Sequence, residues 1–201
     1  MISLIIVIAI ALIGAATVSL LHDGVSARAN PTALEVMLAR KARHMAIPKS
    51  ARTLQNTEAD TPESLRDARL HFADHCAICH ANDGSCDTPL GRNLYPKPPD
   101  LRREQTQTLA DGELFWIIEN GVRFTGMPAF GGGNSGHGSQ TDSWKLVRFI
   151  RHLPQLTQQE RLEMERYNPK GPDDLQEEKK EDEFMNGGAP QPPGAMEHHH
   201  P

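Results

Sequence analysis

The run Cys76-Ala77-Ile78-Cys79-His80 constrains this chain more than any other feature. Two thiols separated by two residues lie on one side of a helical turn, and an imidazole follows directly. A C-x-x-C-H run is the attachment signature of a c-type haem, in which both thiols form thioethers and the histidine ligates the iron. A redox pair would need a βαβ context, and a structural zinc site needs four ligands. Cys86 is the only other cysteine, so the sequence favours haem.

A second candidate ligand is Met127, in the run Gly126-Met127-Pro128-Ala129-Phe130. A lone methionine is more often a core residue, because its flexible thioether fills irregular gaps. This one falls in a turn rich in glycine and proline. A thioether opposite a histidine is the axial pair that raises the potential of a c-type haem. Met127 is therefore the candidate distal ligand, with His80 as the proximal one.

With C-x-x-C-H followed by G-M-P, the stretch from Thr61 to Thr157 resembles a class I cytochrome c of the membrane-anchored bacterial kind. The resemblance implies an all-α fold of three main helices around one covalent haem c. It also implies a haem domain on the periplasmic side of a bacterial inner membrane. In relatives, a proline carbonyl just before a haem-packing leucine accepts a hydrogen bond from the axial histidine. The corresponding positions are Pro99 and Leu101, with Pro89-Leu90 as the alternative.

Three helices are expected in this domain. The first starts at Thr61, which caps it, and its apolar stripe continues to both thiols: Leu65, Ala68, Phe72, Cys76 and Cys79. The second covers 109–119 and closes at Asn120-Gly121. The third begins at Thr141 or Asp142 and stops at Pro154. Its apolar face, which includes Phe149, is expected to cross the first helix near Phe72, as in proteins that this chain resembles.

Residues 1–22 are expected to be a membrane anchor or a signal. The apolar run from Ile2 to Leu21 is about as long as a transmembrane helix, and longer than the apolar part of a signal peptide. However, Ala27-Arg28-Ala29 has the form of a cleavage site, and the basic residues follow the run instead of preceding it. The length favours an uncleaved transmembrane helix, with a removed signal as the alternative. Either way, the rest of the chain is exported.

Two further segments flank the haem domain of residues 61–157. Residues 23–60 are expected to be a linker with a short basic helix over Pro31 to Ala46, either on the membrane surface or as a solvated tether. Residues 158–201 are expected to be a flexible acidic tail; Leu156 to Tyr167 is expected to extend as an amphipathic helix with Leu162 and Met164, and the chain beyond Pro169 to be disordered. The stretch from Glu160 to Glu183 holds ten acidic and five basic residues, which accounts for the net charge of −5. This balance argues against a nucleic-acid partner.

Several residues keep alternative interpretations. Cys86 is either an inert loop residue or pairs between chains. His137 and His75 are rival distal ligands, and His198, His199 and His200 either bind a metal weakly or form a polar end. The preferred function is a one-electron carrier between membrane-bound or periplasmic redox proteins of a respiratory chain, and not an enzyme. The alternative is a haem-based gas sensor or peroxidase-like protein with a labile distal ligand.

Overall fold

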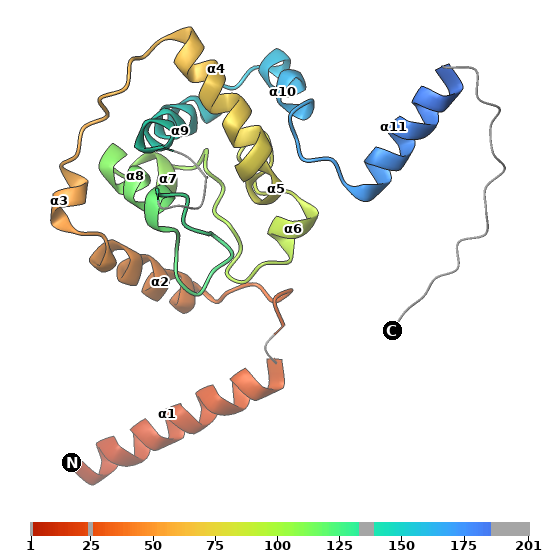
Figure 1. The fold of residues 1–201 in the computed structure, drawn as a ribbon. Helices are drawn as coiled ribbons and strands as arrows, with labels where there is room; N and C mark the ends of the chain where they lie inside the picture. Colours follow the sequence, from red (N-terminus) through yellow and green to blue (C-terminus); the bar gives the residue numbers. More distant parts are fainter. Residues whose placement is uncertain (1, 24–25, 133–138, 186–201) are drawn as a thin grey trace. The chain divides into compact units, whose positions relative to one another are not determined.

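The computed structural model describes residues 2–23, 26–132 and 139–185, which form helices, turns and loops without a strand among them (Figure 1). The elements in chain order are α1 (Ile2–Asp23), α2 (Ala33–Ala46), α3 (Lys49–Arg52), α4 (Pro62–His71), η1 (Phe72–Cys76), α5 (Ala77–His80), α6 (Pro89–Arg92), α7 (Glu104–Gln107), α8 (Asp111–Asn120), α9 (Gln140–His152), η2 (Leu153–Gln155), α10 (Gln158–Glu165) and α11 (Pro172–Met185). Residues up to Asn168 form one compact unit, and those from Pro169 form another. The all-α prediction is confirmed.

The first helix of the haem domain runs through α4, η1 and α5 without a break. Thr61 caps it by accepting a hydrogen bond from the Ser64 N–H at 3.1 Å, and Pro62 occupies the first turn, as the sequence predicts. Its central part, η1, is a π-helix, closed by the Ala77 N–H donating to the Phe72 carbonyl. Single π-turns of this kind occur often at functional sites. This π-turn ends at Cys76, the first cysteine of the motif.

Helix α9 crosses α4 and packs on α8, and these contacts form the core. The rings of Phe72 and Phe149 lie 5.0 Å apart at 60°, a tilted aromatic contact. On the other side of α9, Trp144 stacks on Phe115 at 4.1 Å. Phe72, Phe149 and Val147 are almost completely buried. The predicted crossing of the first and third helices near Phe72 is therefore confirmed.

Part of the predicted linker belongs to this core. Ile47 is 2% exposed, and Ala51 in α3 is also buried. Helix α3 packs on α8 at Gly112, where a Cβ atom would lie 1.9 Å from the Ala51 carbonyl oxygen. Only a glycine allows so close an approach of two backbones. The linker prediction is therefore wrong for this stretch, because Ile47 and Ala51 are buried and α3 packs on α8.

Helix α2 confirms the predicted short helix, with a capping box between Thr32 and Glu35. Polar contacts join it to the haem domain. The Tyr95 hydroxyl donates to Glu35 at 2.8 Å, and Arg40 donates to Gln105. Near the other end, His44 Nδ1 lies 3.5 Å from Glu113. A solvated tether would not have these partners, so the structure favours a helix that lies against its own domain.

The acidic segment begins with a helix, α10, within the predicted range of Leu156 to Tyr167, but this helix is packed on the domain and is not part of a flexible tail. Met164 of α10 is completely buried, and Arg69 of α4 pairs with Glu160 at 2.7 Å and with Glu163. Residues 158–165 are therefore packed on α4 and are not a flexible tail. In the second unit, residues 172–185 form α11, where the sequence predicted disorder, and Lys170 pairs with Glu178 at 2.7 Å.

None of the helices, over the residues described, combines the length and the apolar character required to cross a lipid bilayer. The expected transmembrane helix over Ile2 to Leu21 is not supported by this finding. His198, His199 and His200, predicted either to bind a metal weakly or to form a polar end, lie outside the described residues.

Candidate haem site

The two motif thiols lie on successive turns of one helix. Cys76 ends η1 and Cys79 lies in α5, and neither is in a disulfide. Burial raises the pKa of the Cys76 thiol to about 12, and burial also raises the pKa of Cys79. Both sulfurs therefore carry their protons at neutral pH. Addition of an S–H group across a vinyl group yields a thioether, the bond expected at both positions.

His80 closes the motif at the end of α5. Burial lowers the pKa of its imidazole to about 4, so the ring is neutral and keeps a lone pair for a metal ion. The ring of Phe72 lies 6.4 Å away, and the His80 carbonyl accepts from the Cys86 N–H at 2.9 Å. Ala81, with φ +58°, then turns the chain away from the helix. As the sequence predicts, these three residues share one helix.

The third cysteine lies beside His80, which the sequence did not predict. Cys86 Sγ is 3.5 Å from His80 Nδ1 and in close contact, at 2.6 Å, with the carbonyl oxygen of Pro99. Burial raises the pKa of its thiol to about 12, and the charge of Asp100 adds to this effect. The sequence predicted a hydrogen bond from His80 to the Pro99 carbonyl. In the structure, the Cys86 thiol contacts both of these groups instead.

Leu101 and its neighbour attach the Pro99 segment to the loop after His80. Leu101 is 7% exposed, and its N–H donates to the Gly84 carbonyl at 2.8 Å. Asp100 accepts two hydrogen bonds from Arg102 at 2.9 Å, and these lower the pKa of its carboxyl group to about 2. Arg102 also pairs with Asp83 at 3.0 Å. Leu101 is therefore a core residue that fixes the Pro99 segment next to Cys86.

Met127 lies on the loop between α8 and α9. Its N–H donates to Thr125 Oγ1 at 3.1 Å, and its carbonyl accepts from the Val122 N–H at the same distance. The Phe130 N–H donates to the Ile118 carbonyl at 3.0 Å, which returns the loop to α8. The Met127 side chain is half-buried. Backbone hydrogen bonds therefore hold this loop together and tie its end to α8, and Met127 lies in a turn, as the Gly and Pro residues predicted.

The rival histidines have different positions. His75 lies in η1, with Nδ1 3.2 Å from Asp74 and its ring 4.7 Å from that of His71. His137 lies outside the described residues. Within the described part of the chain, no group of three or more His, Cys, Asp or Glu side chains is arranged to hold a metal ion, so the zinc alternative is not supported.

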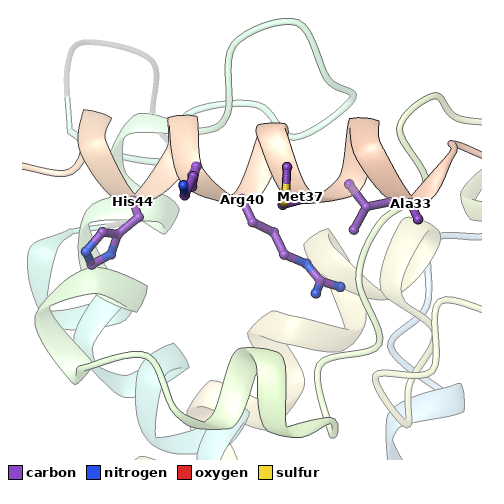
Figure 2. Close-up of a pocket in the computed structure, with 6 residues that line it drawn as sticks. Ala33, Met37, Arg40 and His44 are labelled. Carbon is purple, nitrogen blue, oxygen red and sulfur yellow. The ribbon is translucent and has the colours of Figure 1, made fainter.

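A separate pocket of about 570 Å³ lies on α2 and is lined by Ala33, Val36, Met37, Arg40, Lys41 and His44. Figure 2 shows Arg40 and His44 extending from the same side of the helix. None of the motif residues lines this pocket. The sequence predicted this helix but not a cavity on it.

The residues present fit a covalent haem. A neutral imidazole adjoins two free protonated thiols, and large apolar side chains are exposed both in the motif and in the loop of Met127. Ile78, inside the motif, is 52% exposed, and Phe124, in the Met127 loop, is 90% exposed. A large apolar macrocycle would cover such surface.

The comparison with protein families gives one match. Residues 63–150 match the family model described as cytochrome C oxidase, cbb3-type, subunit III. The matched stretch runs from the first turn of α4 into α9 and includes the motif, Pro99, Leu101 and Met127. No curated protein shows significant similarity to the chain.

Proposed function

Because residues 63–150 form a c-type cytochrome domain, an electron-transfer domain with covalently bound haem c, we propose that the chain is a one-electron carrier of a bacterial respiratory chain. Its partners are then membrane-bound or periplasmic redox proteins, and the haem domain faces the periplasm. The net charge of −5 is consistent with protein partners and not with nucleic acid.

In this proposal each site residue has a separate task. Cys76 and Cys79 would attach the haem, and His80 and Met127 would supply the two protein ligands to its iron. The bound haem supplies an iron ion that takes up and releases one electron. His80 contributes a neutral nitrogen donor from the end of a rigid helix, and Met127 contributes a thioether, which favours the ferrous state. With both axial positions filled, no coordination site is open to a substrate.

The observation that carries the proposal is the half-buried imidazole of His80, kept neutral because burial lowers its pKa, directly after two free thiols on one helix. The helix fixes the position of the histidine relative to both thiols. Such a site keeps its geometry in both oxidation states, which lowers the reorganisation that accompanies electron transfer.

The test is a set of absorption spectra of the purified holoprotein. We expect a ferric absorption band from sulfur-to-iron charge transfer, and a ferrous haem that does not bind carbon monoxide. Met127→Ala should abolish the band and allow carbon monoxide to bind, while the covalent haem is retained. Rapid carbon monoxide binding by the parent protein would favour the gas sensor or peroxidase-like alternative.

The matched control is His75→Ala, because His75 lies on the same helix as the motif and is the rival ligand among the described residues. It should leave both the ferric band and the lack of carbon monoxide binding unchanged. Loss of the parent spectrum in His75→Ala, with Met127→Ala unchanged, would reassign the distal ligand.

A further inference from the structure

Cys86 touches the two groups that the sequence expected to bond to each other. Its Sγ lies 3.5 Å from His80 Nδ1 and contacts the Pro99 carbonyl oxygen at 2.6 Å. A thiol has one weak donor and one weak acceptor function. It can therefore accept from an imidazole N–H and donate to a carbonyl at the same time.

The backbone holds this thiol in place. Cys86 has φ +66°, a left-handed conformation that residues other than glycine rarely adopt. Its N–H donates to the His80 carbonyl at 2.9 Å, and the neighbouring loop is tied to Leu101 through the Gly84 carbonyl. A strained backbone persists only where the surrounding structure fixes it, and such residues cluster at functional sites. The contact with His80 therefore arises from a closed loop and not from a freely rotating side chain.

We propose that Cys86 is a positioning residue for the haem ligand His80. Its Sγ accepts the hydrogen bond from His80 Nδ1–H, and its S–H group donates to the Pro99 carbonyl. The groups that bond to a metal-bound histidine fix its ring orientation and tune its basicity. A thiol is a weaker acceptor than a peptide carbonyl, so the ring keeps less imidazolate character. The ferric state is then stabilised less, and the reduction potential is higher than with a direct bond to Pro99.

This inference rests on the proposed ligation of iron by His80, and its test separates the two. The test variant is Cys86→Gly, because glycine adopts φ +66° without strain and the backbone is preserved. The measurements are the midpoint potential of the holoprotein and the NMR resonance of His80 Nδ1–H in the ferrous state. We expect the resonance to move and the potential to fall in Cys86→Gly, because the Pro99 carbonyl becomes the acceptor.

Two further variants make the result specific. Cys86→Ser retains a group that both donates and accepts, so it should lie closer to the parent in both measurements than Cys86→Gly does. Ser85→Ala is the matched control, since the Ser85 hydroxyl accepts from the Asp87 N–H and contacts neither His80 nor Pro99. Ser85→Ala should leave both measurements unchanged. If Cys86→Gly gives no holoprotein, Cys86→Ala replaces it with the same expectation.

An unchanged resonance and potential in Cys86→Gly would overturn the role of Cys86, and so would an equal change in Ser85→Ala. A parent protein whose spectrum lacks an axial imidazole would instead refute the proposed function, and this inference with it. Because the parent spectrum is recorded first, the two failures are distinguished before any variant is compared.

Discussion

Met164→Ala tests whether α10 is part of the haem domain in solution. The Met164 side chain is completely buried, although the helix that carries it is short and was predicted to be the amphipathic start of a flexible tail. Replacing a buried methionine with alanine costs about 2–5 kcal/mol, depending on how far the site collapses. Helix α10 is short and lies at the end of the domain, so we expect partial relaxation and a loss of about 2–3 kcal/mol.

The assay is denaturation of the oxidised holoprotein by guanidinium chloride, followed by far-ultraviolet circular dichroism. A change in the midpoint at constant m-value reports the loss of stability. Leu162→Ala is the matched control, because Leu162 lies on the same helix but is 51% exposed. It should change stability by about 0.5 kcal/mol or less. Equal effects of the two substitutions would show that α10 does not pack on α4 in solution.

Three further predictions follow from the structure. Gly112→Ala should destabilise the fold, because the new Cβ would lie 1.9 Å from the Ala51 carbonyl oxygen. Alanine normally favours a helix over glycine, so a rise in the midpoint of denaturation would contradict the close approach of α3 and α8. Burial alone would raise the pKa of Glu160, but hydrogen bonds from Thr157 and His152 outweigh it and lower the pKa to about 2. Because the pKa of Glu160 is lowered in the folded protein, its carboxylate stabilises the fold above pH 4.5, and this stabilisation is lost as the pH falls from 4.5 to about 2. Glu160→Gln should therefore lose less stability over this pH range in acid denaturation. An unchanged dependence of stability on pH would contradict the pairing. Cys76→Ala and Cys79→Ala should each lower the yield of holoprotein sharply, measured as haem per chain, whereas normal yields would exclude them as attachment residues.

The features that could be predicted from the sequence are those determined within one or two helical turns. The motif thiols, His80 and the cap at Thr61 depend only on local spacing. The contact between Phe72 and Phe149 joins distant helices, but the resemblance to known cytochromes supplied that pairing. The Met127 loop followed from its Gly and Pro residues.

The contacts that were missed depend on residues far apart in the sequence. Arg69 and Glu160 are separated by 91 positions, so the helical pattern around Glu160 did not show that this helix pairs with α4. The packing of Ala51 on α8 depends on the absence of a side chain at Gly112. Cys86 reaches His80 only because its own backbone turns left-handed and the Pro99 segment closes over it. No local pattern reports such contacts.

The central claim is that Cys76 and Cys79 bind haem covalently. The most direct measurement is the mass of the peptide that contains Cys76-Ala77-Ile78-Cys79-His80, after extraction of the purified protein with acid acetone and proteolysis. We expect the colour to stay with the protein and this peptide to carry the mass of one haem. Haem in the acetone phase, with the peptide at its unmodified mass, would contradict the assignment.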